Sequence, residues 1–256
     1  MKNGQDVGYG YKRVKTMALF RRKKKQSDDS IINGVKLVTA VEPKNVVSEQ
    51  FRTVRTNIDF SSVDKQIKTL LFTSSGMSEG KSTVSANTAV TWAQQGKKIL
   101  FIDADLRRPS VQSSFDLVNG RGLSSVLSNN LDFHEVTQQT AIDNLEVITS
   151  GPIPPNPAEL LNSNRMKRLL DSVEAEYDLV LLDVPPLLSV TDTQVLAARV
   201  DGVVLVVRQG VAQKTAITRA VELLQMVHAN LLGYVLNDMV PRDGYGYGYG
   251  YGYGHE

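Results

Sequence analysis

The stretch from Leu70 to Val84 constrains the fold more than any other part of the chain. It begins with an apolar run typical of a buried strand, continues through a loop of small residues, and opens a helix with Gly80-Lys81-Ser82-Thr83. Such a junction directs backbone N–H groups and the positive end of a helix dipole toward an anion. Lys81 is then expected to reach the β- and γ-phosphates of a nucleotide, and the Ser82 hydroxyl to bind Mg²⁺. The stretch therefore predicts a P-loop.

This loop departs from the usual P-loop pattern at one position. Ser75 stands where a glycine is expected four residues before the Gly-Lys pair, and the glycine follows at Gly76. The alternative is a chance small-residue turn that carries a surface lysine. On the P-loop interpretation, the residues expected to hold the nucleotide are Ser75, Gly76, Met77, Ser78, Glu79, Gly80, Lys81, Ser82 and Thr83.

Strands and helices alternate along the rest of the chain. With 256 residues and 41% apolar content, the chain can form one sizeable α/β domain with tails. The alternation predicts an α/β fold of the P-loop NTPase type, with a mostly parallel sheet and helices on both faces. The expected strands are Thr69–Thr73, Lys98–Asp103, Leu145–Thr149, Leu179–Asp183, Val203–Val207 and Leu232–Asn237. The expected helices are Ser82–Gln95, Pro157–Glu176, Thr191–Arg199 and Gln213–Val227.

Charge is unevenly distributed along the chain. The net charge is +2, but residues 1–30 hold nine Lys and Arg against three acidic residues. The remaining domain is slightly acidic, which argues against general nucleic-acid binding. We expect residues 1–40 to form a flexible basic arm, with a short extended piece at Val35–Val41, followed by a folded domain at 41–240. The run Arg21–Lys25 is either a solvated tail or a segment attracted to an anionic membrane surface.

No apolar run reaches the ~20 residues that a membrane-spanning helix needs, so no membrane span is expected. The chain has no cysteine, which fits the cytosol.

Three aspartates stand at the carboxyl ends of expected strands, where ligands of such sheets bind. Asp183 ends the Leu179–Asp183 strand and is placed to support a Mg²⁺ ion beside the P-loop. Asp103 and Asp105 follow the Lys98 strand, and two carboxylates so close together would repel each other without a cation nearby. One of them could hold Mg²⁺ while the other accepts a proton from an incoming hydroxyl.

A helix from Ser48 to about Phe60 carries Glu49, Arg52 and Arg55 on one stripe, with Glu49 and Arg52 close enough to pair. The stripe is either a solvated helix face or a surface that docks against a neighbouring subunit.

The last sixteen residues, 241–256, differ in composition from all that precede them. Tyrosine and glycine alternate strictly from Gly244 to Gly254. Alternating glycine cannot build a packed core, so the segment is expected to be a flexible tail bearing phenols. It is either a low-complexity sticky tail or a set of phosphate acceptors, which would be Tyr245, Tyr247, Tyr249, Tyr251 and Tyr253.

Together these features resemble the bacterial tyrosine kinases of capsular and exopolysaccharide synthesis, in the cytoplasmic form found in Gram-positive bacteria. The resemblance extends from about Val41 to Val240 and includes the tyrosine-rich tail. It rests on an ExxRxxR motif (Glu49, Arg52, Arg55), a Walker A-like loop (Gly76 to Thr83), a Walker A′ segment (Phe101 to Asp105) and a Walker B segment (Leu179 to Asp183).

The resemblance implies autophosphorylation of the tail tyrosines with ATP and Mg²⁺, in trans within a ring formed through the ExxRxxR helix. It implies activation by a transmembrane adaptor, which would place the chain at the inner face of the plasma membrane, and a cognate tyrosine phosphatase. By position, Lys81 would contact phosphates, Ser82 and Asp105 would serve Mg²⁺, Asp103 would be the base, Asp183 would support the metal, and Asn237 would touch adenine.

Two other classes remain open at this point. Positioning and partitioning ATPases have a related sheet, but they carry an extra lysine where this chain has Gly76, and they lack a tyrosine tail. A nucleotide-gated scaffold that recruits polymer-assembly proteins is the non-enzymatic alternative.

Overall fold

A computed structural model describes residues 33–61, 66–129 and 131–239 of the chain. Most of the predicted basic arm and the whole tyrosine tail lie outside the described residues. Within the described part, no helix is both long and apolar enough to cross a membrane.

The centre of the described chain is a seven-stranded sheet in the order β3-β4-β2-β5-β1-β6-β7. All neighbouring strands are parallel except β3 and β4, so the predicted mostly parallel sheet is confirmed. The strands are β1 (Thr69–Ser74), β2 (Ile99–Asp103), β3 (Thr137–Gln139), β4 (Leu145–Ile148), β5 (Leu179–Asp183), β6 (Gly202–Arg208) and β7 (Leu231–Asn237).

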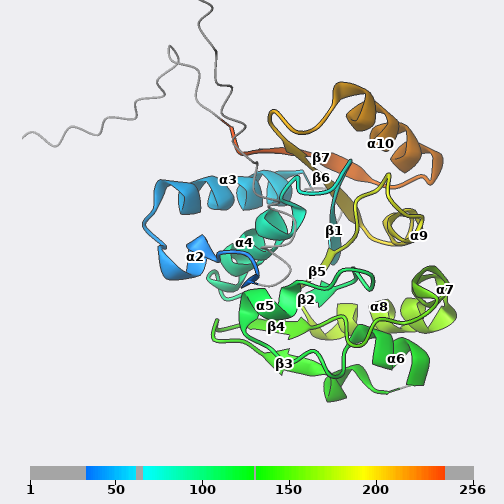
Figure 1. The fold of residues 1–256 in the computed structure, drawn as a ribbon. Coiled ribbons are helices and arrows are strands. Elements are labelled where there is room, and N and C mark those ends of the chain that lie inside the picture. Colours follow the sequence, from blue (N-terminus) through cyan, green and yellow to red (C-terminus); the bar gives the residue numbers. More distant parts are fainter. Residues whose placement is uncertain (1–32, 62–65, 130, 240–256) are drawn as a thin grey trace, which may run out of the picture.

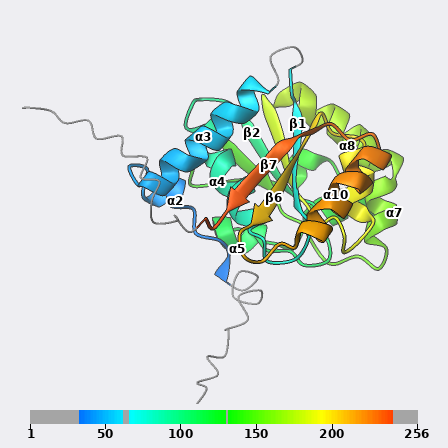
Figure 2. The ribbon, with the colours of Figure 1, turned by 90° about the horizontal axis from the view of Figure 1, so that it is seen from above.

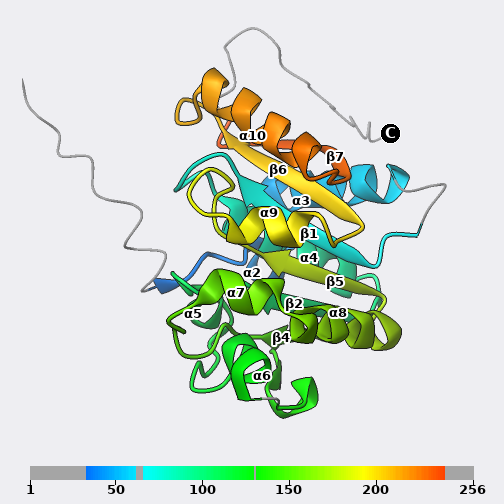
Figure 3. The same ribbon diagram turned by 90° about the vertical axis from the view of Figure 1, so that its right-hand side faces the viewer.

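Helices cover both faces of the sheet (Figures 1 and 3). One face carries α2 (Val38–Val41), α3 (Val46–Phe60), α4 (Lys81–Ala93) and α5 (Val111–Phe115). The other carries α6 (Leu123–Asn129), the 3₁₀ turn η1 (Phe133–Glu135), α7 (Pro157–Asn162), α8 (Asn164–Glu176), α9 (Asp192–Ala197) and α10 (Lys214–Met226).

One apolar cluster lies between each face of the sheet and the helices that cover that face. Alternate residues of one strand belong to opposite clusters. In β1, Leu71 joins the α6–α10 side, while Leu70 and Phe72 join the α3–α4 side. This explains why the strands read as continuous apolar runs rather than as alternating patterns.

The segment expected to be extended at Val35–Val41 is different in the structure, because Val38–Val41 forms a helical turn. Thr39 is buried there, and its N–H donates to the Asn87 side chain of α4 at 3.1 Å. Val35, Leu37 and Ala40 pack on the same apolar cluster as α4. The folded part of the chain therefore includes residues that were assigned to the basic arm.

Two helix boundaries also differ from the sequence-based expectation. Helix α3 begins at Val46 because the Asn45 side chain caps it by accepting from Val47 N at 2.9 Å. Ser48, where the helix was expected to begin, therefore lies inside the helix and is buried. The single helix expected over Pro157–Glu176 is broken at Ser163, whose extended backbone ends α7 and whose hydroxyl caps α8. The short elements β3, α5 and α6 were not predicted.

Candidate active site

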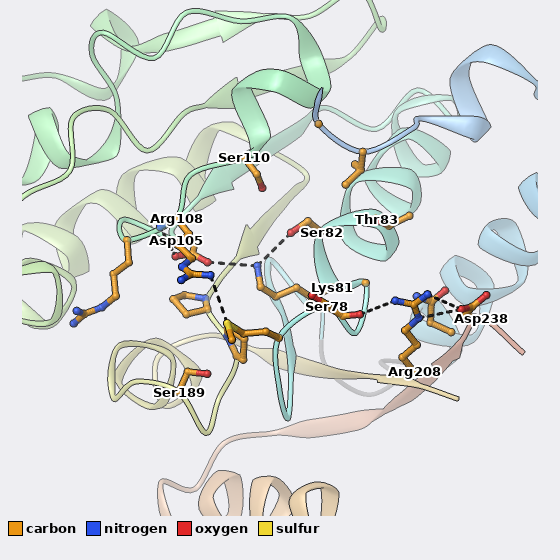
Figure 4. A pocket seen from close by; sticks show the side chains of 18 of the residues that line it. Ser78, Lys81, Ser82, Thr83, Asp105, Arg108, Ser110, Ser189, Arg208 and Asp238 are labelled. Atoms are coloured by element: carbon orange, nitrogen blue, oxygen red, sulfur yellow. Dashed lines mark hydrogen bonds and ion pairs between the residues drawn. The ribbon is translucent and has the colours of Figure 1, made fainter. Parts of the chain in front are cut away.

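A cavity of about 850 Å³ opens beside the loop between β1 and α4 (Figure 4). Other parts of its wall come from the residues after β2 and β5 and from the ends of β6 and β7, as expected for a sheet of this kind. The predicted site residues that line it are Met77, Ser78, Gly80, Lys81, Ser82, Thr83, Asp105 and Asn237.

The loop reaches α4 through a backbone conformation that glycine favours. Gly80 has φ +89°, and a Cβ atom added there would lie 2.1 Å from Asn237 Nδ2. The Asn237 amide itself donates to the carbonyl oxygen of Glu79 at 3.1 Å. Asn237, at the end of the edge strand β7, therefore holds the loop in place and also faces the cavity.

Three other predicted loop residues stand behind the cavity wall. The Glu79 carboxylate, which is buried, accepts from Ser75 Oγ and from Gly76 N, both at 2.5 Å. These contacts close the loop on itself. Ser75, Gly76 and Glu79 therefore shape the loop, while the surface that faces the cavity is made by the residues on either side of Glu79.

Lys81 lies at the centre of the site. Its Nζ atom is 3.5 Å from Asp183 Oδ2 and 3.6 Å from Asp105 Oδ2, and it contacts Ser82 Oγ at 3.2 Å. The Ser82 hydroxyl donates to Asp183 Oδ2 at 2.6 Å. The structure thus gathers Lys81, Ser82, Asp105 and Asp183 into one cluster. Lys81, Ser82 and Asp105 line the cavity (Figure 4), and Asp183 is buried.

Burial governs the ionisation of this cluster. Burial and the neighbouring charges of Asp183 and Asp105 raise the pKa of Asp103 to about 8. Burial also raises the pKa of Asp183, although the Lys81 charge opposes the rise. For Lys81, burial alone would favour the neutral amine, but the carboxylates of Asp183 and Asp105 outweigh it, so the pKa is raised. The ammonium form of Lys81 is held by these acids.

Asp103 occupies a different position from Asp105. It is fully buried, and its oxygens accept backbone N–H groups of Asp105 at 3.1 Å and of Ser110 and Val111 at 3.2 Å each. It is the direct neighbour of Asp183 in the pairing of β2 with β5. Asp103 therefore shapes the loop that carries Asp105, and its assignment as a base stays a prediction.

Arginines that the sequence reasoning did not single out also line the cavity. Arg107 makes a two-point ion pair with the buried Asp192, with distances of 2.8 and 3.2 Å. Arg208 bonds Asp238 at 2.8 Å and donates to the Ser78 carbonyl oxygen at 3.1 Å. Arg208 ends β6 at the carboxyl edge of the sheet, where ligands of such sheets bind. That position could have identified Arg208 as a candidate site residue from the sequence.

The expected stripe on α3 forms only in part. Glu49 and Arg52 pair as predicted, and Arg52 also donates to the Pro43 carbonyl oxygen at 2.8 Å. Arg55 instead is half-buried and donates to the Thr91 carbonyl oxygen of α4 at 2.9 Å. The guanidinium of Arg55 is therefore engaged within its own chain.

No group of three or more His, Cys, Asp and Glu side chains in the described ranges is arranged to hold a metal by itself. This is compatible with Mg²⁺, which proteins usually bind through one or two carboxylates together with phosphates and water.

The sheet, the loop and the cavity together define a P-loop NTPase-type protein, and residues 68–233 match the family model described as an AAA domain. The chain is 49% identical to the tyrosine-protein kinase YwqD of Bacillus subtilis (strain 168) over 201 residues, which cover 78% of this chain and 85% of the relative. It is 42% identical to the putative tyrosine-protein kinase CapB of Staphylococcus aureus over 198 residues, which cover 77% and 87%.

The crystal structure of the chimerical protein CapA2B2 is similar to this chain with a TM-score of 0.76 and 38% identity, covering 83% of this chain and 98% of that one. The chain belongs to the bacterial tyrosine kinases, and the resemblance drawn from its motifs is confirmed.

Proposed function

We propose that this chain transfers the γ-phosphoryl group of Mg-ATP to the tyrosines of its own C-terminal cluster. The acceptors are Tyr245, Tyr247, Tyr249, Tyr251 and Tyr253. Of the two tyrosines within the described domain, Tyr177 is buried and its hydroxyl bonds Glu146, so it is a poor acceptor, whereas Tyr234 is exposed.

The observation that carries the chemistry is the position of Lys81 between Asp105 and Asp183, next to the Ser82 hydroxyl. The Lys81 ammonium lies beside the carboxylates of Asp105 and Asp183, and the Ser82 hydroxyl lies next to the ammonium. These donors fit the Ser/Thr and Asp pair by which P-loop proteins hold Mg²⁺. Ser82 and Asp183 would hold the ion with Asp105, and the bound ion would neutralise charge on the phosphates.

Residues of the chain carry out the remaining steps, which are phosphate binding and phosphoryl transfer. Lys81 turns from the carboxylates to the β- and γ-phosphates, and the N–H groups around Gly80 bind the same oxygens. A tyrosine phenolic oxygen forms the new bond to the γ-phosphorus, the bond from that phosphorus to the β–γ bridging oxygen breaks, and ADP leaves. The phenolic proton passes to a carboxylate.

Asp103 is our proposed acceptor of that proton. Because its oxygens are occupied by N–H groups of Asp105, Ser110 and Val111, the loop between them has to open before a phenol can reach it. Asp105, which lines the cavity directly, is the alternative acceptor. Asp103→Asn and Asp105→Asn variants compared at saturating Mg-ATP separate the two.

We further propose that copies of the chain form a ring through α3, so that each tail enters the site of a neighbour. The exposed Glu49 supports this, since its side chain is 65% accessible and it pairs with Arg52. Our proposed partners are a transmembrane adaptor that activates the kinase at the inner face of the plasma membrane, a cognate tyrosine phosphatase, and further protein substrates. The process so regulated is capsular or exopolysaccharide synthesis and export.

Intact mass after incubation with Mg-ATP and a fragment of the adaptor tests the proposal, with Lys81→Met as the inactive control. We expect up to five additions of ~80 Da, each the mass of one phosphate group. These additions should map to Tyr245–Tyr253 and should be absent in the variant. ATP turnover with an unmodified tail would favour a positioning-type ATPase instead, and no turnover with the activator present would favour a nucleotide-gated scaffold.

A further inference from the structure

The nucleotide cavity extends to both sides of the P-loop. Strand β1, which leads into the loop, lies between β5 and β6 in the sheet. On the β6 side the wall includes Arg208 and Asn237, and on the other side it is made by residues that follow β2 and β5. Figure 2 shows the arrowheads of β6 and β7 on the same side of the molecule as α5, the helix that follows the β2 loop. In Figure 4, Lys81 lies between Arg108 on one side and Arg208 on the other.

These two sides suit different parts of the reaction. Asn237, the expected adenine contact, ends β7, whereas Asp105, beside which the proposed transfer takes place, follows β2 on the opposite side of the P-loop. A nucleotide bound in this way directs its γ-phosphate toward β2 and β5. A tyrosine acceptor is therefore expected to approach along the wall that contains Arg107, Arg108 and Ser189.

The loop that forms this wall is held by several contacts. The backbone N–H of Arg108 donates to Asp105 Oδ1 at 3.0 Å. Further along, two backbone N–H groups of the loop donate to the buried Asp103. The Arg107 side chain is bound at two points by the buried Asp192. The backbone from which the Arg108 side chain projects is therefore fixed beside the phosphoryl-transfer site.

The Arg108 guanidinium is exposed, and among the described residues no acid pairs with it. Its Nη1 atom contacts the Met77 thioether sulfur at 3.6 Å (Figure 4). Because a thioether is only a weak acceptor, this contact leaves the positive charge uncompensated. The other two arginines of the wall differ, since Arg107 is paired with an aspartate and Arg208 with another. Arg108 is thus open to an anionic ligand.

We propose that Arg108 is a specificity-determining residue that binds a negative group two residues away from the acceptor tyrosine. The inference rests on the proposed function and names its substrate class, which is tyrosine peptides with a phosphotyrosine or an acidic residue at that spacing. In an extended peptide, side chains two residues apart share one face and are separated by about 6.6–7.2 Å. A peptide that presents its acceptor to the cavity therefore presents the negative group to the same wall. A guanidinium binds phosphate or carboxylate through two parallel hydrogen bonds.

The proposed acceptor cluster has this spacing in its sequence. Tyrosine alternates with glycine from Gly244 to Gly254, so each phosphotyrosine stands two residues from another acceptor. Asp243 stands two residues before Tyr245, and no other tyrosine of the cluster has an acid at that spacing. We therefore expect Tyr245 to be modified first, with each phosphate favouring the neighbouring tyrosine.

Short glycine peptides with one acceptor tyrosine test the inference. Each peptide carries glycine, lysine, glutamate or phosphotyrosine two residues before or two residues after the acceptor. The full chain phosphorylates them with Mg-ATP and the adaptor fragment. We expect kcat/KM to rise at least about 5-fold from the glycine to the phosphotyrosine peptide, for at least one of the two positions. Glutamate should give an intermediate value and lysine the lowest, and the differences should shrink in 1 M salt.

Variants of Arg108 identify the residue that reads the charge. Arg108→Gln should bring the ratio of kcat/KM between the phosphotyrosine and glycine peptides to about one. Arg108→Lys should restore part of the ratio, because it keeps the charge but not the two-point geometry. The matched control is Arg219→Gln, which removes an exposed arginine of α10 outside the cavity wall and should keep the ratio. Because each ratio compares two peptides on one enzyme preparation, a loss of folded protein does not change it.

Peptide affinity in the presence of Mg-ADP gives a readout without turnover. In fluorescence anisotropy, the phosphotyrosine peptide should bind the wild type more tightly than the glycine peptide, and Arg108→Gln should remove the difference. If no peptide is phosphorylated while this difference persists, the proposed function fails and the anion site stands. Equal affinities without phosphorylation would overturn both.

Two further results would overturn the proposal while leaving the kinase function intact. One is a kcat/KM that is equal for the phosphotyrosine and glycine peptides at both positions, or a preference that survives in Arg108→Gln. The other is an equal loss for all peptides in Arg108→Gln together with a raised KM for Mg-ATP, which would assign the guanidinium to the nucleotide.

Discussion

The Ser82 hydroxyl donates a 2.6 Å hydrogen bond to the Asp183 carboxylate, across 101 residues of sequence. The bond joins the first turn of α4 to the carboxyl end of β5, and the Lys81 ammonium lies beside both groups. Because Asp183 is buried and ends a central strand, it gives the loop a rigid reference point. The position of Lys81 is thereby set by the sheet rather than by the loop alone.

Ser82→Ala should reduce tail phosphorylation by at least about 10-fold, because it removes both a proposed Mg²⁺ ligand and a hydrogen bond to Asp183. The rate measured against Mg²⁺ concentration should show a weaker apparent metal affinity. Ser85→Ala is the matched control, since Ser85 bonds the other Asp183 oxygen only at 3.4 Å and lies outside the cavity wall. An equal loss in both variants would contradict the role of Ser82.

Gly80→Ala should destabilise the domain by about 1–3 kcal/mol, since φ is +89° and the new Cβ would lie 2.1 Å from Asn237 Nδ2. Urea denaturation measures the effect. Adding Asn237→Ala removes the clash but not the backbone strain, so the double variant should recover part of the loss relative to the sum of the single variants. Strict additivity would show that the two residues do not interact.

Glu49→Ala and Arg55→Ala should separate assembly from stability. The Arg55 guanidinium bonds the Thr91 carbonyl oxygen inside the chain, so its loss should lower the free energy of unfolding by about 1–2 kcal/mol. Glu49 is largely exposed, so its loss should weaken the oligomer in sedimentation while the urea midpoint of the monomer stays unchanged. A monomer equally stable in both variants would refute this distinction.

The contribution of His134 to stability should depend on pH. Hydrogen bonds to Asp132 at 2.7 Å and to Glu176 at 3.0 Å raise the pKa of His134. Because the folded pKa exceeds the ordinary value of about 6.5, this stabilisation is complete below about pH 6.5 and is lost as pH rises through the folded pKa.

Urea midpoints of the wild type and of His134→Gln should therefore differ more at pH 5.5 than at pH 9. The difference at pH 5.5 should shrink in 1 M salt, because both partners are exposed to solvent. A difference independent of pH would show that the ring contact with Phe133, at 4.0 Å between centroids, carries the effect instead.

Apolar runs predicted the six parallel strands because most of these strands are covered on both faces, although the edge strand β7 leaves Tyr234 and Leu236 exposed. The P-loop predicted α4 because its chemistry demands a helix at that point. β3 could not be predicted, because none of its three polar residues is buried and its pairing with β4 is tertiary. The break at Ser163 was missed because the residues on both sides favour a helix, and only the capping of α8 by the serine hydroxyl reveals it.

At the site, the sequence predicted which acids lie close together, but it did not predict which groups each carboxylate contacts. Asp103 and Asp105 look equivalent in sequence. The structure places Asp105 against Lys81 and uses Asp103 to accept the N–H groups of the following loop. The orientation of Arg55 likewise depends on α4 lying against α3, and helical spacing alone carries no information about that contact.

The ammonium of Lys81, held by Asp105 and Asp183, acts as a built-in counter-ion for these two carboxylates. On the proposed function, nucleotide binding would be an exchange of ions, in which the lysine would leave the acids for the phosphates and a divalent cation would take its place. ATP without its metal would draw the lysine away and leave two buried acids facing a polyanion. We expect the site to reject the free nucleotide and to select the metal complex as a single unit.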